Sequence, residues 1–288
     1  MNQKPVLAVI GGSGLYEFPS LQDAEKLDVE TPFGQPSSPI IIGTLEGKRV
    51  AFLARHGIGH RFLPSEVNYR ANIYALKKIG ASRILSISAC GSLREDYSPG
   101  HIVIPDQVVD HTHSRARTFF GQGIVAHIGS ADPFCSSLSE VLFQALMQTG
   151  ATIHRGGTYI TIEGPSFSTK AESNLYREWG MSIIGMTACP EIFLAREAEM
   201  CYTTMAHVTD YDVWHVSEEP VTVEMVIKVL IQNTIVAQEA VVNMVKLLPE
   251  EDDCACHSIL KDAIMTNKTV IAPEALQRIN LLVKKYIK

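Results

Sequence analysis

The sequence predicts an α/β fold in which a mixed central β-sheet is flanked by α-helices. Along the whole chain, short apolar runs of strand length alternate with segments whose apolar residues recur at helical spacing. Neither a low-complexity linker nor an internal repeat interrupts this alternation. We therefore expect residues 1–288 to form a single domain, with 249–288 as a C-terminal tail and helix that could lie at an interface.

The expected elements of the first half begin with a buried strand at 6–12 that ends in glycines. Residues 39–57 predict a hairpin that turns at Glu46 and Gly47. A helix is expected over 65–80, because its apolar residues have helical spacing between an initial serine and a terminal glycine. The sequence then predicts strands at 83–91 and 101–110 and a helix at about 136–149.

The second half continues the alternation. We expect strands at 158–165, 181–187 and 200–210, with one helix starting near Ser168 and another over about 190–199. A long helix is predicted over about 222–247, a loop over 249–256 and a closing helix over 272–287. Proline and glycine gather at the strand ends, and open α/β sheets bind ligands there.

Composition and charge exclude several classes of protein. The chain is 46% hydrophobic and 19% charged, which is ordinary for a soluble enzyme. Its net charge is -6 and it has no lysine or arginine run, so a nucleic-acid surface is not expected. The N-terminal apolar run is too short for a signal peptide, and no run reaches the roughly 20 residues that span a bilayer. We expect a cytoplasmic protein without a membrane partner.

Six scattered cysteines do not have the density of a secreted disulfide scaffold. Cys254 and Cys256 form a C-x-C pair, which lacks the two-residue gap usual in zinc sites, and no C-x-x-C completes a ligand set. The spacing therefore predicts no metal.

Several strand ends carry groups that suit a phosphate ion. Ser13 lies in the glycine-rich turn at 10–16, Arg55 and His56 follow a strand, and Ser88 and Thr187 lie at two further strand ends. Hydroxyls, backbone N–H groups of glycine turns and a guanidinium fork all donate to phosphate oxygens. Singly, each has a plainer reading: a tight turn, a surface arginine or small packing residues. Together, without a lysine-rich loop or a magnesium cage, they favour inorganic phosphate over ATP as a reactant.

Two aspartates follow an apolar segment near 205–215. Asp210 and Asp212 are two residues apart, and in an extended segment such residues point to the same side. A metal, a shared proton or a ligand with matching donors would each explain the pair. A metal is the weakest of these, because no third ligand lies nearby in the sequence.

A series of motifs, in order along the chain, resembles the methylthioadenosine phosphorylase branch of the trimeric purine nucleoside phosphorylase family. The resemblance extends over residues 6–248 and implies a nucleoside phosphorylase-like fold with a partly barrel-like mixed sheet. It rests on these segments: IGGSGLY, TPFGQPS, LARHGIGH, VNYRANIYALK, SACGSLRED, IPDQVVD, ADPFC, IEGPSFST, GMT and VTDYDVW.

The resemblance implies a reaction of purine and methionine salvage. Phosphate would attack C1' of the ribosyl group of 5'-methylthioadenosine, releasing adenine and forming 5-methylthioribose 1-phosphate. No cofactor is implied, since phosphate is itself a co-substrate. By resemblance, the phosphate contacts are Ser13, Arg55, His56, Ser88, Ala89 and Thr187.

The resemblance also implies a preference for a 6-aminopurine. Ser168 stands where relatives that act on 6-oxopurines carry a glutamate, and Asp210 stands where they carry an asparagine. A carboxylate accepts a hydrogen bond from a 6-amino group and repels a 6-oxo group. Asp210 and Asp212 are therefore expected to be the catalytic pair that holds N7 and the 6-amino edge, in an order that stays open.

Further substrate contacts follow from the same resemblance. Met186 would touch the ribose, Phe167 the base or ribose, and Tyr211 the nucleoside. Val223 and Val226 would form the apolar wall for the methylthio group, with Val223 also setting specificity; their plainer reading is the core of a long helix. His127 would reach the site of a neighbouring subunit, which implies a homotrimer or a dimer of trimers.

The C-x-C pair resembles that of archaeal members in which cysteine pairs can form disulfides. This resemblance implies a pairing of Cys135 with Cys201, with Cys254 and Cys256 as further possible disulfide cysteines. Two other functions remain open from the sequence. One is a broader purine nucleoside or methylthioinosine phosphorylase. The other is a non-catalytic nucleoside-binding protein, which would require damage to the phosphate-binding residues.

Overall fold

The computed structural model describes residues 4–12, 18, 20–215, 223–251 and 253–287, and the side chains of 223–232 lie outside this description. The strands are β1 Leu7–Gly11, β2 Gln22–Leu27, β3 Ile40–Leu45, β4 Lys48–Ala54, β5 Arg83–Ser92, β6 Ile102–Ile104, β7 Gln107–His111, β8 Ile153–Arg155, β9 Thr158–Ile162, β10 Ile183–Gly185 and β11 Cys201–Asp210. The α-helices are α1 Tyr69–Lys78, α2 Ser136–Leu146, α3 Lys170–Glu178, α4 Ala188–Glu197, α5 Val223–Leu247 and α6 Pro273–Val283. Short 3-10 helices are η1 Asp212–Trp214, η2 Ala255–Ser258 and η3 Lys268–Val270.

The strands form one mixed sheet that branches at β5. Its main path runs β2-β3-β4-β1-β5-β10-β9-β7, while β11 pairs with β5 and β6, and β6 pairs with β8. β1 is parallel to β4 and β5, whereas β3 and β4 form an antiparallel hairpin. The mixed α/β fold is thus confirmed. The sheet is not a closed barrel, because β2 and β7 end the main path without pairing with each other among the described strands.

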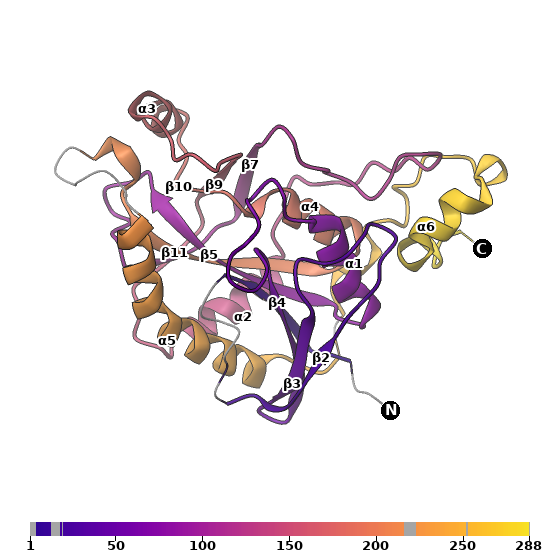
Figure 1. Ribbon diagram of the computed structural model, residues 1–288, viewed down its shortest axis with the longest axis horizontal. Coiled ribbons are helices and arrows are strands. Elements are labelled where there is room, and N and C mark those ends of the chain that lie inside the picture. The colour runs from indigo at the N-terminus through magenta and orange to yellow at the C-terminus, as the bar shows by residue number, and fades with distance from the viewer. Residues whose placement is uncertain (1–3, 13–17, 19, 216–222, 252, 288) are drawn as a thin grey trace.

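Helices cover both faces of the sheet. α1 and α4 lie on one side, and α2 and α5 lie on the other (Figure 1). β1 shows the consequence, since Ala8 and Ile10 pack into the core beneath α1 and α4 while Leu7 and Val9 pack into the core against α2 and α5. A strand covered on both faces is apolar throughout, which explains the continuous apolar run at its start.

The boundaries differ from the sequence prediction where backbone chemistry intervenes. The expected strand at 101–110 divides into β6 and β7 at Pro105, which has no N–H to donate to a ladder. α1 begins at Tyr69, after the Asn68 side chain accepts from the backbone N–H of Ala71 at 3.2 Å. β2 was not expected, because its residues are mostly exposed and polar, as is common at a sheet edge.

The C-terminal segment lies at one end of the molecule, where α6 projects beyond α1 and α4 (Figure 1). It is tied to the body by the backbone N–H of Leu260, which donates to Glu199 Oε1 at 3.0 Å, and by the Tyr286 hydroxyl, 2.5 Å from the same oxygen. None of the described helices is long and apolar enough to cross a membrane. None of the six cysteines is in a disulfide, so the expected disulfides are not found in this structure.

Candidate active site

A cavity of about 810 Å³ opens where β4, β5, β10 and β11 end. Residues that the sequence predicted separately line it together. They are Arg55, His56, Ser88, Ala89, Phe167, Ser168, Met186, Thr187, Asp210 and Asp212. The strand ends therefore bring the phosphate-type donors and the carboxylate pair to one cavity, as is usual for ligand sites of open α/β sheets.

Other predicted residues are not found in this lining. Ser13 lies outside the described residues, as do the side chains of Val223 and Val226. His127 is exposed and does not line the cavity; its backbone N–H donates to the Ala263 carbonyl at 2.9 Å. Tyr211 is half-buried beside the cavity, where its hydroxyl lies 2.8 Å from Ser98 Oγ.

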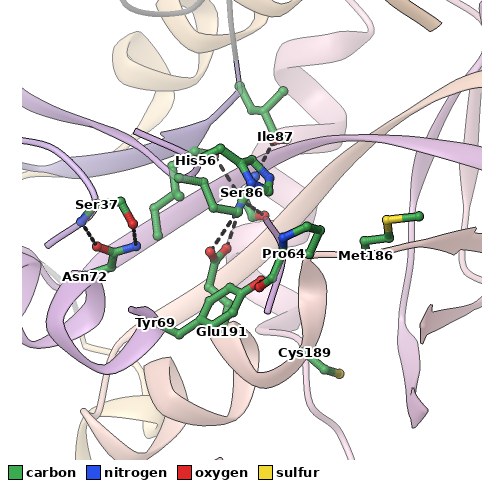
Figure 2. A network of polar contacts seen from close by, with 12 residues as sticks. Ser37, His56, Pro64, Tyr69, Asn72, Ser86, Ile87, Met186, Cys189 and Glu191 are labelled. Atoms are coloured by element: carbon green, nitrogen blue, oxygen red, sulfur yellow. Dashed lines mark hydrogen bonds and ion pairs between the residues drawn. The ribbon is translucent and has the colours of Figure 1, made fainter. Parts of the chain in front are cut away.

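Arg55 lies beneath the cavity and is almost completely buried. Its Nε and Nη2 donate to the two carboxylate oxygens of Glu191 at 2.8 and 2.9 Å, and Nη1 donates to the Ile87 carbonyl at 3.1 Å. Figure 2 shows the Glu191 carboxylate below Ser86, whose Oγ accepts from Nη2 at 2.8 Å. The sequence suggested that the Arg55 guanidinium binds phosphate, but most of its N–H groups donate to protein acceptors, chiefly the Glu191 carboxylate. One Nη1 hydrogen has no acceptor among the described residues.

His56 is held as a neutral imidazole. Burial, and then the charge of Arg55, lower the pKa of His56 to about 4. Its Nδ1 lies 3.0 Å from the Phe62 carbonyl, which only accepts, so Nδ1 carries the proton and Nε2 keeps its lone pair. The ring also stacks on His60, with centroids 4.3 Å apart. His60 and Arg61 line the same cavity and were missed by the sequence analysis.

Three buried hydroxyls gather around β5 and β10. Ser88, Thr187 and Tyr159 lie close together, yet none of their hydroxyls makes a hydrogen bond of regular geometry to the described residues. Thr187 is the N-cap residue of α4, but its side chain caps no N–H. Gly185 permits this approach, because a Cβ there would lie 2.1 Å from the Tyr159 hydroxyl. The Ser88 and Thr187 hydroxyls are therefore available to an oxyanion at the cavity wall.

The carboxylate pair is set by a bulge and a turn. The pairing of β11 with β5 shifts between Val208 and Asp210, so Thr209 is the extra residue that re-aims Asp210. Asp212 then has φ +51° and begins η1, so it does not continue the strand. Both side chains line the same cavity, as expected. The expected reason, alternation along one strand, was wrong, because Asp212 lies beyond the strand.

Burial governs the protonation of both carboxyls. Burial raises the pKa of Asp210, whose Oδ1 accepts from Asp212 N at 2.8 Å and whose Oδ2 accepts from Thr209 Oγ1 at 2.6 Å. Burial, with a contribution from the Asp210 charge, raises the pKa of Asp212 to about 6. Asp212 Oδ2 is buried and makes no hydrogen bond of regular geometry to the described residues, and the same holds for Ser168 Oγ. Asp212 Oδ2 and Ser168 Oγ can therefore form hydrogen bonds with polar groups of a ligand.

Gly91 gives the two aspartates their room. A Cβ at this position of β5 would lie 2.9 Å from Asp210 Oδ1 and 3.3 Å from Asp212 Cβ. Any side chain here would push at least one carboxyl out of place. The glycine is thus required by close approach, since the strand itself does not need it.

Arg115 was missed by the sequence analysis and organises two loops of the site. Its Nη1 donates to the carbonyls of Met186 and Cys189 at 2.6 and 2.7 Å, and its Nη2 donates to the Glu163 carbonyl at 2.8 Å. Nε also pairs with the Glu163 carboxylate at 3.1 Å. Nothing in the local sequence separates Arg115 from a surface arginine, because all of these partners are distant along the chain.

His207 and Asn233 form a second missed group on the cavity wall. Both ring nitrogens of His207 and the Asn233 amide nitrogen are buried without a hydrogen bond to the described residues. Burial lowers the pKa of His207 to about 4, so its ring is neutral. The sequence did offer one indication of His207 as a site residue, because it is a polar residue in an apolar strand, three positions before Asp210.

Comparisons with known proteins agree with one another. The Phosphorylase superfamily profile matches residues 6–246. A Geobacter sulfurreducens protein named S-methyl-5'-thioadenosine phosphorylase is 55% identical over 283 residues, which cover 98% of this chain and 99% of the relative.

Solved structures give the same result. A methylthioadenosine phosphorylase from an antarctic soil metagenomic library superposes with a TM-score of 0.93 at 44% identity, covering 98% of this chain and 99% of that one. A methylthioadenosine phosphorylase from Schistosoma mansoni, in complex with adenine, has a TM-score of 0.83 at 37% identity, covering 86% and 93%.

Proposed function

Because this chain belongs to the phosphorylase superfamily, we propose that its cavity carries out phosphorolysis of 5'-methylthioadenosine with the residues described above. The reaction breaks the bond between N9 of adenine and C1', and it forms a bond between C1' and a phosphate oxygen. The products are adenine and 5-methylthioribose 1-phosphate. One observation carries the assignment of residues: oxyanion-type donors and a buried carboxylate pair line a single cavity.

Phosphate is held at the β4, β5 and β10 end of the cavity. The Ser88 and Thr187 hydroxyls donate to its oxygens, with Ser13 and the backbone of Ala89 completing the set. Neutral His56 has a lone pair on Nε2 that accepts a hydrogen bond from the hydroxyl of monohydrogen phosphate, so an unprotonated oxygen is turned toward C1'. Arg55 adds its charge and one N–H, and Glu191 fixes its position. The phosphate so placed is both nucleophile and counter-charge to the oxocarbenium-like transition state.

The departing base is held by the aspartates. As the C1'–N9 bond breaks, electrons flow into the purine and N7 becomes basic. Asp210, whose pKa is raised by burial, delivers a proton or a strong hydrogen bond to N7. Asp212, with a buried unpaired oxygen, accepts from the 6-amino group, and Ser168 leaves this edge free of a second carboxylate. The opposite assignment of the two aspartates is tested below.

The sugar lies between these ends. Met186 packs against the ribose. Its side chain lies against Gly164, and a Cβ added to that glycine would be 2.5 Å from the Met186 sulfur. Phe167 is 45% exposed at the cavity rim, where it closes over the nucleoside together with Tyr211. Val223 and Val226 form the wall for the methylthio group.

The active enzyme is a homotrimer or a dimer of trimers of single-domain subunits in the cytoplasm. His127 is exposed on the surface away from its own cavity, which suits a residue that completes the site of a neighbour. The 249–288 segment contributes to the same interfaces. Phosphate is the sole co-reactant that the proposal requires.

The test is adenine release followed by chromatography with and without phosphate. We expect adenine and methylthioribose 1-phosphate to appear in equal amounts, and only when phosphate is present. Adenine release at the same rate without phosphate would mean hydrolysis and would overturn the proposal.

A further inference from the structure

Four of the six cysteines meet outside the substrate cavity. The Sγ atoms of Cys135, Cys201, Cys254 and Cys256 all lie within 4.8 Å of one another. The Cys135 and Cys254 sulfurs are 3.7 Å apart. Within the part of the chain that the structure describes, no other set of three or more metal-type ligands is gathered so closely.

Three distant segments supply these sulfurs. Cys135 is the N-cap residue of α2, Cys201 is the first residue of β11, and Cys254 and Cys256 flank the start of η2 in the C-terminal segment. Cys135 and Cys201 are buried, and the other two are half-buried. All four belong to or pack against the apolar core formed with α2 and α5. The cluster thus gathers four soft ligands at the edge of the apolar core.

We propose that these four cysteines bind one Zn²⁺ ion as a structural tetrathiolate site. A tetrahedral zinc with Zn–S bonds of about 2.3 Å has sulfur atoms about 3.8 Å apart. The observed separations are 3.7 Å for one pair and at most 4.8 Å for any pair, so small side-chain shifts close the site. Binding converts four thiols to thiolates and releases their protons to solvent.

The surroundings favour a negatively charged tetrathiolate. The backbone N–H of Leu138, at the start of α2, donates to Cys135 Sγ at 3.5 Å, where the helix dipole also favours an anion. The Lys77 ammonium lies near enough to Cys201 for their charges to interact. Such outer contacts orient ligands and balance charge at metal sites.

A metal accounts for the cluster better than the disulfides that the sequence led us to expect. Disulfides would divide the four sulfurs into pairs, each closing to about 2.05 Å with an oxidant accepting two electrons. The structure instead has one quartet in which every sulfur is near every other. Closed sets of four thiolates select zinc, or iron where iron is supplied. Sequence spacing alone could not reveal this cluster, because two of its cysteines come from segments far from the C-x-C pair.

Zinc would fasten the C-terminal segment to α2 and β11. This role is independent of the catalytic assignment, since none of the four cysteines lines the substrate cavity. The test begins with full-length protein purified without reductant or chelator, whose zinc and iron are measured by mass spectrometry. We expect about one zinc per chain in the wild type and in the control Cys189→Ser, whose thiol is buried elsewhere. The double variant Cys254→Ser/Cys256→Ser should have almost none.

A count of reactive thiols distinguishes the zinc site from disulfides. After denaturation with a chelator and without reductant, all six thiols should react. Fewer reactive thiols would show disulfides and overturn the proposal, and about one iron per chain in place of zinc would overturn the choice of metal. If the double variant does not fold, metal-free wild type is titrated with Co²⁺. Saturation at one equivalent with a thiolate-to-cobalt charge-transfer band supports the site, and absence of that band overturns it.

Discussion

Arg55 and Glu191 form a fully buried, bidentate ion pair directly beneath the cavity, with N–O distances of 2.8 and 2.9 Å. Glu191 also accepts from the Tyr202 hydroxyl at 2.9 Å. The pair fixes the arginine against the strand ends and leaves one N–H for a ligand. The pair positions the charge of Arg55, and most of the Arg55 N–H groups already donate to protein acceptors.

Replacing Glu191 by glutamine should therefore destabilise the fold strongly. Removing one partner of a buried ion pair leaves an uncompensated charge and costs about 3–5 kcal/mol. Urea unfolding measures the loss. The matched control is Glu140→Gln, because Glu140 pairs with Arg155 on the surface, where solvent screens the pair and its loss has little effect on stability. Equal losses in the two variants would contradict a structural role for Arg55–Glu191.

Asp210→Asn tests the proposed proton donor to N7. Asparagine keeps the shape of the side chain but cannot deliver the proton, so kcat for methylthioadenosine should fall by about 10²–10⁴. The melting temperature should stay near that of the wild type, and Asp132→Asn, at an exposed position, should leave kcat unchanged. If Asp212→Asn lost more turnover than Asp210→Asn, the two roles would be exchanged.

The raised pKa of Asp212 predicts an acid limb in catalysis. Its folded pKa is about 6, so the carboxylate that accepts from the 6-amino group is present above pH 6 and is lost below it. The value of kcat/KM should fall about tenfold per pH unit below that point. Phosphate and the substrate also titrate, so the quantity to plot is the ratio of wild type to Asp212→Asn at each pH. A flat ratio from pH 5 to 8 would show that Asp212 does not titrate in the free enzyme.

Arg115→Lys tests the arginine that joins the two loops. Lysine keeps the charge but has fewer donors in a different geometry, so carbonyls of the Met186 and Glu163 loops lose their partners. We expect KM for both substrates to rise and kcat to fall, each by about tenfold, because each lost buried hydrogen bond costs about 1–3 kcal/mol. Arg117→Lys, half-exposed and two residues away, is the control. Unchanged KM values in Arg115→Lys would remove its positioning role.

Local sequence chemistry predicted the residues at the strand ends well. Thr187 follows β10 and Asp210 is the last residue of β11, and strands of one sheet bring their ends together. Ser88 lies within β5, which continues to Ser92, so its expected place at a strand end was wrong although it lines the same cavity. The same reasoning could not find Glu191 or Arg115, because their partners are far away in sequence and a single buried ion pair has no periodic signal. It also misjudged how Asp212 reaches the cavity, since a bulge and a positive φ have no simple sequence pattern.

In the proposed function, the cavity binds a 6-aminopurine nucleoside through Asp210 and Asp212. The most direct test compares phosphate-dependent base release from methylthioadenosine, methylthioinosine, adenosine and inosine under identical conditions. We predict the highest kcat/KM for methylthioadenosine and a loss of at least about tenfold for each 6-oxo counterpart, since a buried carboxylate would face a carbonyl oxygen. Equal or higher values for methylthioinosine and inosine would contradict the account.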